Sequence, residues 1–189
     1  MRRWVVRIVV LATVLALAIF VLDRTSLLMP LGPGGASSAP TIPACDARTV
    51  AEGFTYKFRD PRRGEMVLLH LSGALGGTLT PDPDGDLSLA KRVVGVPGDQ
   101  VLARNGRVYV NGLKIDDLTT APFRRVDLAN GQYFVLGDNR SASQDSRDFG
   151  PVLRDAIYGR VFFILWPLGS FGTLPSRKAG DPPGQVTCD

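Results

Sequence analysis

The sequence predicts a mostly β domain with long loops, preceded by a single apolar helix at the N-terminus. After residue 24, short runs of β-branched and aromatic residues recur between glycine, proline and asparagine, and no segment has the spacing of an amphipathic helix. Asn-Gly pairs at Asn105 and Asn111 separate alternating apolar runs, which is typical of antiparallel hairpins. A chain of 189 residues, 44% hydrophobic and 21% charged, has room for one such domain and a small additional element.

The first element is an apolar run from Trp4 to Leu22 that contains one charged residue, Arg7, near its start. Its 19 residues are enough for a helix that crosses a bilayer as a single-pass transmembrane anchor. Basic residues precede the run and only one acid–base pair follows it, so the N-terminus is expected in the cytoplasm and residues 25–189 outside the cell membrane. The alternative is a cleaved secretory signal, with an apolar core from Ile8 to Leu22.

The rest of the chain divides by composition. We expect residues 1–24 to form the cytoplasmic stub and anchor, residues 25–174 an extracytoplasmic β domain, and residues 175–189 a flexible polar tail. Segment 31–43 is predicted to be an extended loop because its prolines exclude a helix, and the Gly/Pro/Asp-rich segment 74–86 is predicted to be an inserted loop. The predicted strands are 53–58, 65–71, 90–96, 100–115, 132–137 and 156–166.

The composition excludes some classes of site. Residues 1–24 hold four arginines and one aspartate, which is +3 of the formal net charge of +4, and no basic run with interleaved aromatics follows, so nucleic acid is not expected as a partner. The single histidine, His70, has no second ligand nearby, so no metal or cofactor is expected. Cys45 and Cys188 lie on the exported side, where an oxidising compartment would let them pair; the sequence leaves this open.

A lysine, Lys91, stands at the head of the apolar run 90–96. Period two places Lys91 on one face of the strand and Arg92 on the other, so one cation must point inward or toward a cleft. A lysine that keeps an edge strand soluble is the ordinary alternative. Desolvation lowers the pKa of a lysine and yields a neutral amine that can take a proton from a hydroxyl. Without a usable histidine, Lys91 is therefore the candidate general base.

Two other segments carry groups that suit this chemistry. Candidate hydroxyls are Ser37, Ser38 and Thr41, among small residues that also suit a plain linker. Segment 137–152 contains closely spaced charges of both signs, which indicate a network of ion pairs rather than an ordinary solvated turn. These charges are Asp138, Arg140, Asp145, Arg147 and Asp148.

Four blocks in this chain resemble the type I signal peptidases, membrane-anchored serine proteases with a Ser/Lys dyad. "SSAPT" is similar to the family's Ser-Met-x-Pro-Thr box, and "RRGEMVLL" to its Arg-Gly-Asp-Ile-Val strand. "AKRVVGVPGD" and "GDNRSASQDSR" are similar to its Lys-Arg-Val-x-Gly-x-Pro-Gly-Asp and Gly-Asp-Asn-Arg-x-x-Ser-x-Asp-Ser-Arg boxes, which are long and specific. The resemblance implies a signal-peptidase-like antiparallel β domain without a metal or cofactor.

Carried over by position, the resemblance implies Ser37 as the nucleophile and Lys91 as the general base. Ser143 resembles the hydroxyl that orients the lysine amine, and Asp145 and Arg147 resemble a structural pair that braces the site. The implied reaction is acyl transfer: signal peptides are cleaved from secreted preproteins after small residues, at the outer face of the membrane.

Two positions depart from the family pattern. Ser38 replaces the usual methionine after the nucleophile, which changes an apolar wall of the substrate pocket; if the methionine were instead deleted, Ser38 would be the nucleophile. Gly35 lies where some relatives place a serine hydroxyl in the oxyanion hole. A catalytically impaired membrane module that binds preproteins or a partner peptidase is therefore an alternative. A related self-cleaving repressor is another, although such proteins carry a DNA-binding domain where this chain has an apolar span.

Overall fold

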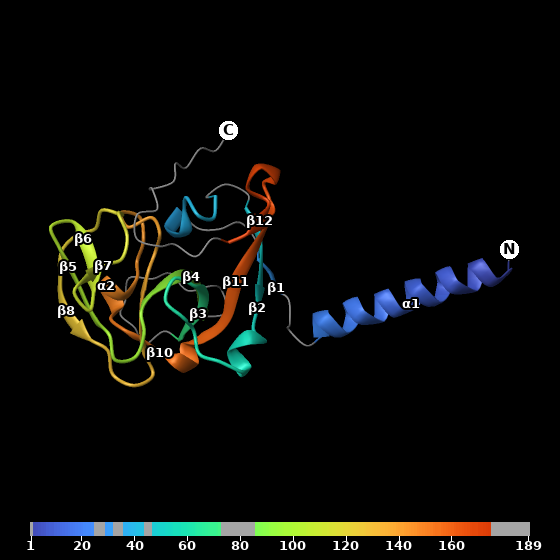
Figure 1. Cartoon of the computed structure of the whole chain (residues 1–189), viewed down its shortest axis with the longest axis horizontal. Coiled ribbons are helices and arrows are strands. Elements are labelled where there is room, and N and C mark those ends of the chain that lie inside the picture. Colours follow the sequence, from blue (N-terminus) through green and yellow to red (C-terminus); the bar gives the residue numbers. More distant parts are fainter. Residues whose placement is uncertain (1, 25–28, 32–35, 44–46, 73–85, 175–189) are drawn as a thin grey trace.

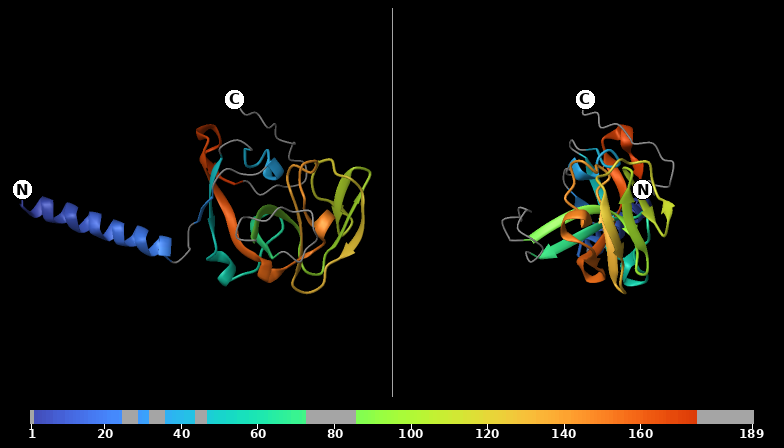
Figure 2. Two further views of the ribbon diagram at one scale, coloured as in Figure 1. Left: turned by 180° about the vertical axis from the view of Figure 1, so that it is seen from behind. Right: turned by 90° about the vertical axis from the view of Figure 1, so that its left-hand side faces the viewer.

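The computed structural model describes residues 2–24, 29–31, 36–43, 47–72 and 86–174. It consists of a β-rich body and one long helix, α1 (Arg2–Arg24), which projects away from the body (Figure 1 and the left view of Figure 2). The predictions for Gly35, Cys45, Cys188, the tail 175–189 and nearly all of the loop 74–86 fall outside the described residues.

Helix α1 covers the predicted apolar run, and its large apolar side chains between Trp4 and Leu15 are 55% to 71% exposed. Among the residues that the structure describes, no helix combines the length and the hydropathy needed to cross a membrane. The helix is therefore confirmed, whereas its predicted membrane-spanning role stays a prediction.

The body contains a large sheet of eight strands in the order β1-β2-β11-β3-β4-β9-β10, with β12 paired to β11. Every strand pairing within the described residues is antiparallel, as predicted. The strands are β1 (Met29–Leu31), β2 (Arg48–Glu52), β3 (Met66–Ser72), β4 (Asp86–Gly95), β9 (Gln132–Leu136), β10 (Val152–Leu153), β11 (Ile157–Trp166) and β12 (Gly172–Thr173).

A second sheet of four strands, in the order β7-β6-β5-β8, lies at the end of the body opposite β1 and α1 (Figure 1). Its first two turns are the predicted Asn-Gly pairs, in which Asn105 and Asn111 have positive φ angles of 51° and 50°. Both residues of a type I′ turn need this conformation, which asparagine and glycine adopt most readily. The strands are β5 (Gln100–Arg104), β6 (Arg107–Val110), β7 (Leu113–Lys114) and β8 (Phe123–Asp127).

Strand β4 is apolar on both faces because it lies between two cores. Val93 packs in a cluster with Val67, Leu69 and Val135, whereas Val94 packs in the cluster under the small sheet. The residues of β4 from Lys91 to Gly95 are all buried. The prediction that one of the two cations points inward or toward a cleft is therefore confirmed for Lys91, and Arg92 is buried as well because both faces of β4 are covered.

Three local predictions were also wrong. Segment 53–58 is not a strand: the Thr55 N–H donates to Glu52 Oε2 at 2.8 Å, and this bond starts the 3₁₀ turn η2 (Thr55–Lys57). Strand β8 was missed because most of its side chains are exposed, so its sequence shows no alternation. The segment predicted as an extended loop contains the 3₁₀ turn η1 (Ala36–Ser38). Shorter elements are α2 (Ser146–Phe149), η3 (Arg154–Ala156) and η4 (Leu168–Ser170).

Candidate active site

Strand β4 brings Lys91 against the η1 turn. The side chain shares a face of the sheet with its partner Val67 on β3, and the residue is 2% exposed. Its Nζ lies 2.8 Å from Ser37 Oγ and donates a hydrogen bond to it. The structure therefore brings together the two residues that the sequence singled out, although 54 positions separate them.

The pKa of Lys91 is lowered to about 8. Burial among apolar side chains is the main cause, because it disfavours the charged ammonium. The charges of Asp145 and Asp148 act in the opposite direction, and that of Arg147 lowers the pKa further. Near neutral pH the site therefore holds an appreciable fraction of neutral amine beside a hydroxyl.

The loop that follows β9 fixes the main chain of η1. The Asn139 N–H donates to the Ser37 carbonyl at 3.1 Å, and Asn139 Nδ2 donates to the Ala36 carbonyl at 3.1 Å. Gly137 allows this approach, because a Cβ atom there would lie 2.7 Å from the Ser37 carbonyl oxygen and would collide with the Ser143 side chain. Asn139 and Gly137 thus position Ser37; the sequence analysis assigned them no role.

Ser38 points elsewhere. The residue is 2% exposed, and its Oγ donates to the Ala90 carbonyl at 3.3 Å. In a 3₁₀ turn, successive side chains are about 120° apart, so only one of the two serines can face the amine. In this structure that residue is Ser37.

Asp145 and Arg147 form the predicted pair. Arg147 Nε and Nη2 donate to the two carboxylate oxygens of Asp145 at 2.7 and 2.8 Å, and Asp145 is fully buried. Asp145 also accepts from the Gly137 N–H at 2.9 Å, and Arg147 Nη2 donates to the Ser143 carbonyl at 3.0 Å. This pair holds together both ends of the loop from residue 137 to residue 143.

Ser143 lines the same cavity as Lys91 and Ser37, but its buried Oγ has no hydrogen-bond partner within the described residues. The contact with the lysine amine that the resemblance implies is not formed here, and the orienting role of Ser143 stays a prediction.

Sequence analysis missed a second ion pair, on the other face of β4. Arg92 Nε and Nη2 donate to the carboxylate of Asp138 at 2.7 and 2.6 Å, and Arg92 Nη1 donates to the Gly64 carbonyl at 2.6 Å. Both charges of the pair are buried. The sequence showed both residues, but nothing in the local pattern indicated that they pair.

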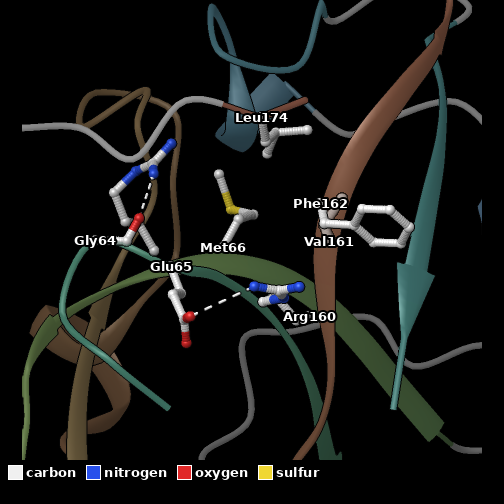
Figure 3. A pocket seen from close by; sticks show the side chains of 8 residues that line it. Gly64, Glu65, Met66, Arg160, Val161, Phe162 and Leu174 are labelled. Carbon is white, nitrogen blue, oxygen red and sulfur yellow. Dashed lines mark hydrogen bonds and ion pairs between the residues drawn. The ribbon is translucent and has the colours of Figure 1, made fainter. Parts of the chain in front are cut away.

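Two cavities flank β4. One, of about 500 Å³, is lined by Ser37, Lys91 and Leu89 and by the loop 141–144. The other, of about 60 Å³, is lined by Arg92 and by the Glu65–Arg160 ion pair, whose charged atoms are 3.7 Å apart (Figure 3). Among the described residues, no serine, threonine or lysine lines the 60 Å³ cavity, so of these two cavities the one of 500 Å³ holds the hydroxyl and the amine.

Comparisons with known proteins find a matching family model, similar sequences and one similar solved structure. Residues 2–166 match the family model described as signal peptidase, peptidase S26. The "Probable signal peptidase I-2" of Synechocystis sp. is 38% identical over 143 residues, which is 73% of this chain and 63% of that protein's length. Signal peptidase IB of Staphylococcus aureus (strain COL) is 32% identical over 193 residues, covering 89% of this chain and 91% of that protein. A crystal structure of a signal peptidase I from Enterococcus faecalis V583 is 27% identical and covers 54% of this chain and 97% of that one, with a TM-score of 0.42.

Proposed function

The chain belongs to the signal peptidase family, peptidase S26, and on that premise we propose that it cleaves signal peptides from secreted preproteins with a dyad of Ser37 and Lys91. The family and the class of activity, a serine endopeptidase that processes signal peptides, are confirmed by the family match and the named relatives. The assignment of residues rests on the 2.8 Å contact between the Ser37 hydroxyl and the buried amine of Lys91, which forms no ion pair within the described part of the chain.

In the proposed reaction, neutral Lys91 accepts the proton of Ser37 as Oγ attacks the scissile carbonyl carbon. Main-chain N–H groups of the η1 turn stabilise the oxyanion. When the carbon–nitrogen bond breaks, Lys91 returns the proton to the leaving amine. A water molecule then gives a proton to Lys91 and attacks the acyl carbon; as the ester bond breaks, Lys91 passes this proton to Ser37 Oγ, which restores the hydroxyl and the neutral amine. A pKa of about 8 suits this cycle, because the amine must both accept and donate a proton near neutral pH.

The substrate class follows from the family and from the shape of the site. Leu89 and the small residues Ala36, Ala142 and Ser143 line the cavity beside the dyad, so an extended peptide with small side chains before the scissile bond fits there. The charges of Asp145 and Arg147 are paired with each other. The residues of the substrate before the scissile bond are therefore recognised by shape and by main-chain contacts.

We also propose that α1 anchors the chain in the cytoplasmic membrane with its N-terminus inside. The apolar side chains of α1 between Trp4 and Leu15 are exposed on every side of the helix, and a helix that is apolar all round needs an apolar environment. Basic residues at its start favour the cytoplasmic side. Protease added to the outer face of intact cells should then degrade the β domain and spare an N-terminal tag; full protection of the domain would contradict this topology.

The experiment that tests the dyad is cleavage of a preprotein by the full chain in detergent, with the cut site read by mass spectrometry. We expect one cut after a small residue in the wild type and none in Ser37→Ala. A folded wild type that binds the preprotein without cutting it would favour the alternative, a catalytically impaired module. Cleavage that persists in Ser37→Ala would contradict the proposed nucleophile.

A further inference from the structure

A second cavity adjoins the candidate active site. Its volume is about 680 Å³, and it is lined by residues 119–123, by Arg140, and by Arg147 and Asp148. Ser141 and Ser143 line both this cavity and the one that contains the dyad. The two cavities therefore adjoin the same loop, on which both serines lie.

Both arginines of the second cavity are already paired with carboxylates. Arg140 is paired with Asp116, and Arg147 with Asp145. Asp148 accepts from the Asp145 N–H at the start of α2. The two cations are therefore neutralised, and the exposed carboxylate of Asp148 disfavours an anionic occupant.

The polar groups left over on this wall are hydrogen-bond donors. Arg140 is 6% exposed, and its Nη1 has no hydrogen-bond partner within the described residues. The hydroxyls of Thr119 and Thr120 accept from Arg107 and Arg147, which leaves their protons free to be donated. These three donors, on a paired arginine and two uncharged hydroxyls, match the carbonyl groups of an extended peptide, and a buried donor without an acceptor is costly until one arrives.

The position of the second cavity indicates which part of the preprotein it can bind, the signal segment or the mature part. Residues 119–123 lead into the small sheet, whereas the chain comes from α1 into the body at β1, at the opposite end (Figure 1). With α1 in the bilayer, the signal segment approaches from the β1 end, and the mature part of the preprotein leaves toward the small sheet.

We propose that the second cavity binds the residues of the preprotein that follow the scissile bond, in an extended conformation and through their main-chain carbonyls. This inference rests on the proposed function, and it assigns residues 119–123 and Arg140 to the recognition of the mature part. Because main-chain carbonyls are common to all sequences, the length of the mature part matters more than its side chains.

The test fills the cavity without altering the dyad. Ala121 is exposed and lines the second cavity, so Ala121→Trp places a large ring in it. Ala129 is also exposed but does not line the cavity, and Ala129→Trp is the matched control. The substrates share one signal segment and end either one residue after the scissile bond or about six residues after it, roughly 20 Å of extended chain.

We expect Ala121→Trp to lower kcat/KM for the long substrate roughly tenfold and to leave the short substrate within about twofold of the wild type. Ala129→Trp should change neither. Equal losses on both substrates, or no loss on either, would overturn the inference while leaving the dyad intact. Failure of the wild type to cleave either substrate would instead contradict the proposed function.

Discussion

Lys91 and Arg92 are neighbouring cations on β4, and their surroundings differ in one respect. Both are almost fully buried, at 2% and 4% exposed, and they point to opposite faces of the strand. Arg92 has the carboxylate of Asp138 at 2.6 Å, whereas Lys91 has the uncharged hydroxyl of Ser37 at 2.8 Å. Burial with a counterion keeps a charge in place and serves the fold. Burial without one lowers the pKa of the amine and supplies a base.

The largest expected effect tests the Lys91 side of this comparison. Lys91→Met keeps the length of the side chain but removes the amine, and cleavage should fall by at least about a thousandfold. The midpoint of urea unfolding should stay the same or rise at neutral pH, because a buried cation without a counterion is lost. Initial rates on one preprotein and circular dichroism in detergent measure the two effects.

A control for this prediction is the double variant Ser37→Ala/Lys91→Met. Since the two residues act as one unit, combining them should cost little more activity than either alone. Losses that multiply would mean that the two side chains act independently and would contradict the dyad.

The second effect tests the Arg92 side. Arg92→Met leaves the carboxylate of Asp138 buried without its partner, and the free energy of unfolding should fall by about 3–5 kcal/mol. Adding Asp138→Leu should recover much of this loss, because no unpaired charge then remains. An unfolding midpoint that Arg92→Met leaves unchanged would show that the pair is not structural, and the contrast with Lys91 would fail.

The third effect is the pH dependence that the lowered pKa of Lys91 implies. Cleavage should rise with pH through an apparent pKa of about 8, since the neutral amine is the base. The free energy of unfolding should also rise with pH. Between pH 8 and about 10.4 the unfolded amine is protonated and the folded one is not, so unfolding takes up a proton, and the free energy of unfolding rises with pH in this window by on the order of 3 kcal/mol.

The variant Lys91→Met isolates the contribution of the Lys91 amine to the pH dependence of stability, because all other titrating groups remain in the variant. The free energy of unfolding of the wild type minus that of Lys91→Met should increase from pH 8 to pH 10.4. A difference that is flat over this range, or a cleavage rate that rises only near the ordinary lysine pKa, would argue against a desolvated amine.

The same comparison separates what the sequence could predict from what it could not. Hairpins at Asn105 and Asn111 and the buried strands follow from local signals, and Lys91 was conspicuous because a cation stood in an apolar run. The pairing of Arg92 with Asp138 joins residues 46 positions apart, so it depends on which strands are neighbours. The turn at η2 likewise depends on one side-chain contact from Glu52. The local sequence pattern predicts secondary-structure elements, whereas the partners of buried charged side chains depend on how the strands are arranged in the sheet.

The smallest expected effect concerns Ser38, and it decides the register of "ASSAPT". Ser38 is buried and donates to the Ala90 carbonyl at 3.3 Å, so its hydroxyl is directed at the main chain of β4 rather than at the Lys91 amine. Ser38→Ala removes this one long hydrogen bond, so we expect a loss of about 1 kcal/mol in the free energy of unfolding and a cleavage rate within about threefold of the wild type. Ser37→Ala, in which a neighbouring hydroxyl is removed by the same substitution, is the matched control and should be inactive. Initial rates on one preprotein, with folding checked by circular dichroism, measure both.

If the methionine of the family pattern were deleted in this chain, the result would reverse: Ser38→Ala would be inactive and Ser37→Ala would still cut. That reversal would require the η1 turn to rotate by about 120° during catalysis, which the hydrogen bond from the Asn139 N–H to the Ser37 carbonyl opposes.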